Sequence, residues 1–146
     1  MAAGMALGAA PGADAAALER SHREALGEAG RTVLVAELGG EVVGMAHLAP
    51  TGAANAPHRA EVQRVAVAES ARGAGIGRRL MEAVEDVAIQ QQLTLLWLTT
   101  HDRSDACAFY ESVGYTKLGV MPGYSLRPDG ALSPAALYFK ELRRSS

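Results

Sequence analysis

The stretch Arg72-Gly73-Ala74-Gly75-Ile76-Gly77-Arg78-Arg79 decides the fold of this 146-residue chain. It follows a β-branched run that ends at Val67 and leads into an amphipathic run that begins near Ile76. Glycines allow positive φ angles and close approach of the backbone, so several N–H groups can converge on one point. That point is also the positive end of the next helix, where anions bind. The stretch therefore predicts a strand, a phosphate-binding loop and a helix, and we call residues 72–79 the cradle.

The arginines of the cradle indicate its ligand. Arg72, Arg78 and Arg79 crowd the N-terminus of the predicted helix, where the helix dipole disfavours cations, so a polyanionic ligand explains them better than helix stability does. The cradle lacks the Gly-Lys-Ser/Thr ending of a nucleotide-triphosphate loop. Its glycines read G-x-G-x-G rather than G-x-G-x-x-G, and the next strand ends Leu98-Thr99-Thr100, without an acidic residue for a ribose. An ordinary glycine-rich turn with solvated arginines is the alternative.

Composition indicates a single globular domain over residues 13–146, behind a flexible Ala/Gly-rich leader over residues 1–12. The net charge is −2, so no global basic field points to nucleic acid or an anionic membrane. The single cysteine, Cys107, excludes an internal disulfide, and the histidines have no metal-ligand spacing. No stretch approaches the roughly 18–20 apolar residues of a membrane span. We expect a cytoplasmic protein without a metal, a nucleic acid or a membrane as partner.

The hydrophobic pattern predicts an α/β fold with a mixed, mostly antiparallel sheet flanked by helices. The apolar run Leu93–Thr99 is typical of a strand that is covered on both faces. The elements that we expect are a helix over 14–29, strands over 32–37, 42–48 and 60–67, a helix from 76 to about 90, a strand over 93–99, a helix over 105–112, and two paired strands over 115–120 and 135–142, separated by a loop over 122–134.

The strand, the Arg-Gly-x-Gly-x-Gly loop and the helix resemble the pyrophosphate-binding motif of the GNAT acetyltransferases. The segment Ala106–Tyr115 resembles their closing motif, A-x-x-F-Y-x-x-x-G-Y. The resemblance implies the GNAT fold and acetyl-CoA as acetyl donor. That fold usually opens with a further strand and helix, for which the 31 residues before Thr32 leave no clear room. Either the sheet has one strand fewer, or a partner chain supplies the missing edge strand, or the start codon was misplaced. The sequence is therefore also compatible with a homodimer.

The resemblance also implies the cofactor contacts. In this fold the strand before the cradle carries a bulge, and its main-chain N–H groups meet the thioester and the pantetheine arm. The implied cofactor-binding residues are Val65, Ala66, Val67, Arg72, Gly73, Ala74, Gly75, Ile76, Gly77 and Arg78.

Acetyl transfer to an amine needs a base for the ammonium proton and a proton for the departing thiolate. Glu61 lies at the start of the strand before the cradle and is the candidate base, although a solvated strand-end residue is the plainer interpretation. The resemblance places Tyr110 beside the CoA sulfur as the acid; the alternative is a core aromatic. Thr99, His101 and Tyr124 are the candidate contacts of the acceptor.

Further segments of the chain are similar to the tabtoxin-resistance acetyltransferases, over residues 59–63, 70–73, 121–124, 128–130 and 138–140. This similarity implies that Glu61 is catalytic. The second catalytic carboxylate of those enzymes falls on Thr99, which cannot act as a base at neutral pH, so toxin resistance does not carry over.

We therefore expect an acetyl-CoA-dependent N-acetyltransferase that acts on a primary amine of a small molecule, by direct attack in a ternary complex. The alternatives are a protein N-terminal or lysine acetyltransferase and a non-catalytic acyl-CoA sensor.

Overall fold

The computed structural model describes residues 30–143 of the chain, so the helix expected over 14–29 and the leader over 1–12 lie outside the described residues. The described elements, in chain order, are β1 (Thr32–Leu38), β2 (Glu41–Pro50), β3 (Arg59–Val67), the 3-10 turn η2 (Glu69–Ala71), α2 (Ile76–Gln90), β4 (Leu95–His101), α3 (Asp105–Ser112), β5 (Thr116–Leu126) and β6 (Leu132–Glu141).

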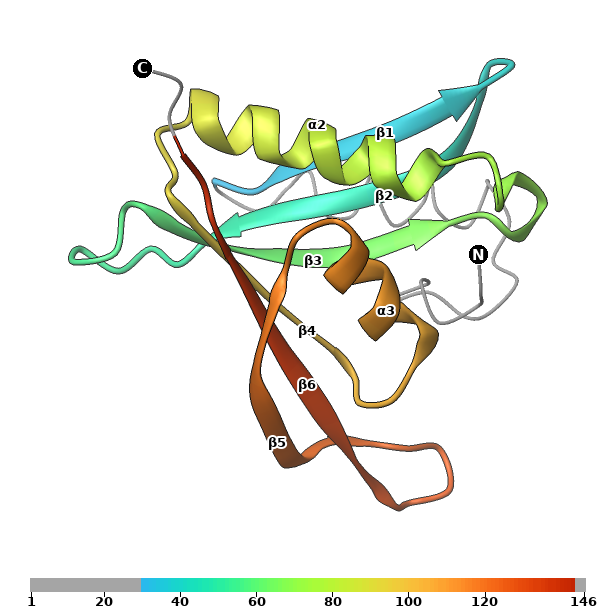
Figure 1. The fold of residues 1–146 in the computed structure, drawn as a ribbon, viewed down its shortest axis with the longest axis vertical. Helices are drawn as coiled ribbons and strands as arrows, with labels where there is room; N and C mark the ends of the chain where they lie inside the picture. The colour runs from blue at the N-terminus through green and yellow to red at the C-terminus, as the bar shows by residue number, and fades with distance from the viewer. Residues whose placement is uncertain (1–29, 144–146) are drawn as a thin grey trace.

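The strands form one mixed sheet in the order β1-β2-β3-β4-β6-β5. Every neighbouring pair is antiparallel except β3 and β4, which are parallel. Helix α2 packs on β1 and β2, and α3 packs against β4, both on one face of the sheet (Figure 1). The predicted mixed, mostly antiparallel sheet with flanking helices is confirmed.

The core lies between this face and the helices. Helix α2 buries Leu80, Met81, Val84 and Ala88, which recur at the helical spacing of one apolar face. Strand β2 contributes Met45, which is fully buried. The apolar face of this amphipathic helix therefore positions α2 over β1 and β2, and places the cradle at its N-terminus.

Gly44 on β2 marks the closest approach in this core. A Cβ added to Gly44 would lie 3.3 Å from the Ala66 carbonyl oxygen, 3.4 Å from the Ala36 Cβ and 3.5 Å from the Ile76 Cγ2. A valine there overpacks the junction of the sheet with the start of α2, so we expect Gly44→Val to lower the free energy of unfolding by about 1–3 kcal/mol. Urea denaturation measures the change. Gly119→Val is the matched control, because nothing lies within 4 Å of a Cβ at this strand position; equal losses in both variants would contradict the prediction.

The structure corrects the loop expected over residues 122–134. Strand β5 continues through Pro122 to Leu126, and Leu126 pairs with Leu132, so the connection to β6 shrinks to residues 127–131. Pro122 is tolerated because β5 is an edge strand and the register shifts between Met121 and Ser125, where a missing N–H costs no ladder bond. The two strands form a long hairpin that extends from the domain (Figure 1).

Within residues 30–143, helices cover one face of the strand that the sequence predicts over residues 93–99. In β4, burial alternates: Leu96, Leu98 and Thr100 are buried under the helices, whereas Leu95 and Trp97 are only half-buried. The half-buried residues belong to the opposite face, on which the described part of the chain places no helix. In the described part of the chain, Leu95 and Trp97 line a groove on this outer face.

Candidate active site

The cradle connects β3, through η2, to α2 and has the backbone that its glycines predict. Gly73 and Gly75 have φ angles of 86° and 74°, a region that L side chains rarely adopt. A Cβ added to either glycine would meet nothing within 4 Å. Helix α2 begins at Ile76 with no side-chain cap and no acidic residue in its first turn. The first N–H groups of a helix have no intrahelical partner. At the start of α2 these unpaired donors therefore face open space, an arrangement that suits the pyrophosphate of CoA.

The arginines of the cradle are anchored to neighbouring elements. The Arg72 Nε donates to the Val67 carbonyl at 3.3 Å, and an Arg78 Nη donates to the Ser112 carbonyl at 3.3 Å. The second Nη of Arg72 is buried and has no hydrogen-bond partner within residues 30–143. A buried guanidinium N–H without a partner is costly, and an anion in the cradle would satisfy it.

A cavity of about 360 Å³ joins the cradle to α3. It is lined by Gly75, Arg78, Asp105, Ala108, Phe109 and Ser112. The structure therefore brings the two motifs of the predicted cofactor site together, although they are about thirty residues apart in the sequence.

Strand β3 separates from β4 and then carries a bulge. Its pairing with β2 skips from Gln63 to Ala66, and Arg64 within the bulge has a positive φ of 52°. On the other side, β3 pairs with β4 only as far as Glu61, opposite Trp97. Beyond this point β4 pairs with β6 alone, so the β4-facing edge of β3 is left without a strand partner in the described sheet.

The segment 65–67, predicted to contact the cofactor through its main chain, lies on this unpaired edge. The side chains of Val65, Ala66 and Val67 are buried in the core. Packing by the side chains is compatible with ligand binding by the backbone, because side chains point out of the plane of the sheet and N–H groups point along it.

A cleft of about 320 Å³ lies where β3 and β4 separate. It brings together the candidate base and the candidate acceptor contacts, Glu61, Thr99, His101 and Tyr124, on three different strands. The Thr99 Oγ1 donates to the Tyr124 hydroxyl at 3.5 Å, across the cleft from β4 to β5. Sequence reasoning did not assign the six further lining residues as site residues, namely Val62, Gln63, Arg64, Thr100, Ser125 and Ala135.

Asp102, the carboxylate closest in sequence to Thr99, does not line this cleft. It forms an ion pair with Lys117, with the Nζ and the Oδ1 3.2 Å apart. Glu61 is therefore the only carboxylate that the described residues contribute to the lining of the cleft.

Tyr110 lies in an aromatic cluster of the core, outside the lining of both the cleft and the cradle cavity. Its ring centroid is 5.9 Å from that of Tyr115 and 6.3 Å from that of Tyr138. Burial, together with the nearby Tyr115, raises the pKa of Tyr110 well above its usual value, so the phenol keeps its proton and can donate a hydrogen bond. Within residues 30–143 its buried hydroxyl has no hydrogen-bond partner.

A Tyr110→Phe substitution separates a structural from a chemical role. Phenylalanine keeps the aromatic packing and removes an unpaired buried hydroxyl, so we expect an unchanged or higher melting temperature. If the hydroxyl hydrogen-bonds a departing thiolate, kcat falls by about 10- to 100-fold. Tyr115→Phe is the matched control, since its hydroxyl is also buried and unpaired within the described residues. Equal kcat values for the two variants would assign Tyr110 to the core alone.

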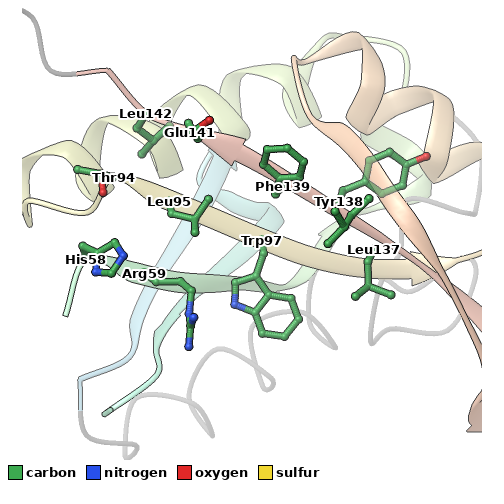
Figure 2. Close-up of a pocket in the computed structure, with 11 residues that line it drawn as sticks. His58, Arg59, Thr94, Leu95, Trp97, Leu137, Tyr138, Phe139, Glu141 and Leu142 are labelled. Atoms are coloured by element: carbon green, nitrogen blue, oxygen red, sulfur yellow. The ribbon is translucent and has the colours of Figure 1, made fainter. Parts of the chain in front are cut away.

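A second, larger hollow of about 690 Å³ occupies the outer face of the sheet, beside the cleft. Figure 2 shows Leu95 and Trp97 of β4 and Leu137 and Phe139 of β6 along it, with Arg59 at one end. Because Trp97 is opposite Glu61 in the β3–β4 pairing, this groove begins where the cleft ends.

Two findings concern other kinds of site. Within residues 30–143, no group of three or more His, Cys, Asp or Glu side chains is arranged to hold a metal ion. The same part of the chain has no helix that is both long and apolar enough to cross a membrane.

Known proteins resemble this chain in sequence and in structure. N-alpha-acetyltransferase 80 of Mus musculus is 46% identical over 59 residues, which are 40% of this chain and 18% of that protein. The chain thus spans less than a fifth of the length of the curated relatives that it matches.

Two solved structures share the fold. A ribosomal-protein-alanine N-acetyltransferase of Brucella melitensis has a TM-score of 0.70 and 29% identity, covering 86% of this chain and 74% of its own. The acetyltransferase YncA of Salmonella typhimurium, solved with its cofactor acetyl-CoA, has a TM-score of 0.70 and 22% identity, covering 90% and 74%. A model of the acetyltransferase (GNAT) family matches residues 7–115, most of the chain. The protein therefore belongs to the GNAT family of acetyltransferases.

Proposed function

We propose that this protein is an acetyl-CoA-dependent N-acetyltransferase that acts on a primary amine. The observation that carries the proposal is the separation of β3 from β4, which leaves a cradle for the donor on the helix side and a cleft with one carboxylate on the outer face. Membership of the GNAT family supports the same donor.

The cradle residues that would hold acetyl-CoA are those predicted from the sequence. The N–H groups of the cradle, from Gly73 to Arg78, would bind the pyrophosphate, and the main chain of residues 65–67 would bind the pantetheine arm and the acetyl carbonyl. When bound, acetyl-CoA supplies an activated acetyl group as a thioester. We propose no metal and no acyl-enzyme.

In this mechanism Glu61 accepts a proton from the acceptor ammonium, directly or through one water. The freed lone pair forms the new C–N bond, and the C–S bond breaks with its electron pair on sulfur. The attacking nitrogen still carries one proton too many, and this second proton would pass to the departing thiolate, so that CoA leaves as the thiol and the product is a neutral amide. The Tyr110 hydroxyl would donate a hydrogen bond to the thiolate until that proton arrives. An alkylammonium has a pKa of about 10, so only about one acceptor molecule in a thousand is deprotonated at pH 7, and a positioned base removes the proton from the bound ammonium.

We propose a small-molecule amine as acceptor, in contact with Thr99, His101 and Tyr124. The cleft of about 320 Å³ has a size suited to a small metabolite. The similarity to the tabtoxin-resistance acetyltransferases favours an amino-acid-like or toxin-like amine, whereas Thr99 in place of their second carboxylate argues against the same substrate.

A protein N-terminus is the second candidate acceptor. The names of two similar proteins, N-alpha-acetyltransferase 80 and a ribosomal-protein-alanine N-acetyltransferase, favour it. Its recognition would need a channel for the chain after the first residue, and the outer-face groove adjoins the cleft.

Turnover of acetyl-CoA, followed as free thiol, tests these assignments. The panel holds amino acids, simple primary amines, toxin-like amines, peptides with free N-termini, and the same peptides with blocked N-termini and a free lysine. Thiol release with the first three groups supports the proposal, and release with peptides alone supports the second candidate. CoA binding without thiol release on any amine would indicate an acyl-CoA sensor instead.

We also propose that the enzyme works in the cytoplasm and has neither nucleic acid nor membrane as partner. The single free Cys107 suits a reducing compartment. Light scattering on the purified protein would distinguish a monomer from a homodimer.

A further inference from the structure

A chain of side-chain hydrogen bonds ends on Glu61. An Arg31 Nη donates to the Gln63 Oε1 at 2.6 Å, and the Gln63 Nε2 donates to the Glu61 Oε1 at 2.7 Å. The same Arg31 nitrogen lies 3.3 Å from the Nδ1 of His47. These hydrogen bonds join the residue before β1 to β2 and β3, and all the side chains that form them are at least half-buried.

Arg31 decides which way the Gln63 amide faces. A guanidinium has donors and no acceptor, so it selects the oxygen end of the amide and leaves the NH₂ end for Glu61. The reversed amide would set Nε2 against a donor and Oε1 against a carboxylate, which are two repulsive contacts. For the same reason His47 presents Nδ1 to Arg31 as an acceptor.

The amide in turn fixes the carboxylate. With Oε1 held by Gln63, Oε2 of Glu61 has no hydrogen-bond partner within residues 30–143 and stays available to a proton from the cleft. Gln63 is the last residue before the bulge, so its position is set by pairing with His47.

We propose that Gln63 and Arg31 are positioning residues that orient Glu61 as the general base. The inference rests on the proposed N-acetyltransferase function and deepens it. The titratable and charged groups nearest Glu61 in the described residues are Arg59 and Arg64 on β3, His47 on β2, Arg31 before β1, and His101 and Tyr124 across the cleft on β4 and β5. The same strands also carry Glu41, at the start of β2, and Lys117 on β5, which pairs with Asp102.

Two substitutions of Gln63 test the contact with Glu61. Gln63→Leu removes both hydrogen bonds, and we expect kcat to fall by about 10- to 100-fold while the dissociation constant of acetyl-CoA stays the same. Gln63→Glu keeps the acceptor for Arg31 but sets a second carboxylate against Glu61. We expect the acid limb of the pH profile of kcat/KM to move to higher pH, because two adjacent carboxylates resist ionising together.

Arg31 is tested by a conservative pair. Arg31→Met removes the donor and is expected to lower kcat, and Arg31→Lys should recover part of the loss because an ammonium can still donate to the Gln63 oxygen. Arg103→Met, whose side chain is 95% exposed, is the matched control and should leave kcat unchanged. Melting temperatures of all variants separate a loss of activity from a loss of folding.

A double-mutant cycle with Glu61→Gln decides the matter. If Gln63 acts through Glu61, Gln63→Leu costs little further activity once Glu61 is replaced; independent losses that multiply would overturn the inference. All rates use the primary amine of the panel with the highest kcat/KM. A wild-type protein that releases no thiol with any amine contradicts the proposed function and this inference together. An active wild type with multiplicative losses contradicts the inference alone.

Discussion

We expect the Gly75→Glu variant to lose CoA binding. The φ of 74° and the open space around Gly75 place a new side chain in the mouth of the cradle, next to the N-terminus of α2. The added carboxylate would occupy the position of the pyrophosphate and repel it, so the dissociation constant should rise by at least about 100-fold. Isothermal titration calorimetry with CoA measures it.

The control for this variant separates blocking from backbone strain. A non-glycine residue at a positive φ costs about 1–2 kcal/mol of stability wherever it lies. Gly52 has a φ of 75° and equally open surroundings but belongs to the loop between β2 and β3, so Gly52→Glu carries the same strain away from the cradle. If Gly52→Glu weakened CoA binding as much as Gly75→Glu, the assignment of the cradle would be wrong.

Glu61→Gln is expected to have the largest effect on turnover. Glutamine is isosteric and can keep the hydrogen bond from Gln63, so the cleft retains its shape while the base is lost. At neutral pH we expect kcat to fall by about 100- to 1,000-fold, a common contribution of a general base.

The loss should shrink as the pH rises. An alkylammonium titrates at about pH 10, so at high pH the acceptor arrives deprotonated and needs no base. Rates of wild type and variant measured between pH 6 and about pH 10 therefore converge. Glu41→Gln, at an exposed position at the start of β2, is the control and should follow the wild type throughout. A Glu61→Gln profile parallel to that of the wild type would remove Glu61 from the mechanism.

Features with a local cause could be predicted from the sequence. The cradle is set by glycines that adopt positive φ angles, α2 by an apolar stripe at helical spacing, and the first hairpin by β-branched runs on either side of Gly39 and Gly40. The fold class followed from the order of these elements.

Features that depend on contacts between distant parts of the sequence could not be predicted. The hairpin of β5 and β6 extends across Pro122 because of pairing with a distant strand, and Arg31 reaches Gln63 across 32 residues of sequence. Gln63 could have been suspected, since strand alternation puts it on the same face as Glu61. Nothing in the local sequence indicates that Arg31 points there. Trp97 could be placed in a strand, but only the sheet order shows that it faces a groove.

The short pairing of β3 with β4 has one more consequence. It covers only three residue pairs, from Arg59 to Glu61, so β3 and β4 diverge in the middle of the sheet beyond this point. If the cradle holds the donor and the cleft holds the acceptor, as proposed, the two reactants would meet where these strands diverge. In that arrangement the donor and the acceptor use separate binding surfaces, so a substitution in one of them is expected to leave binding at the other unchanged.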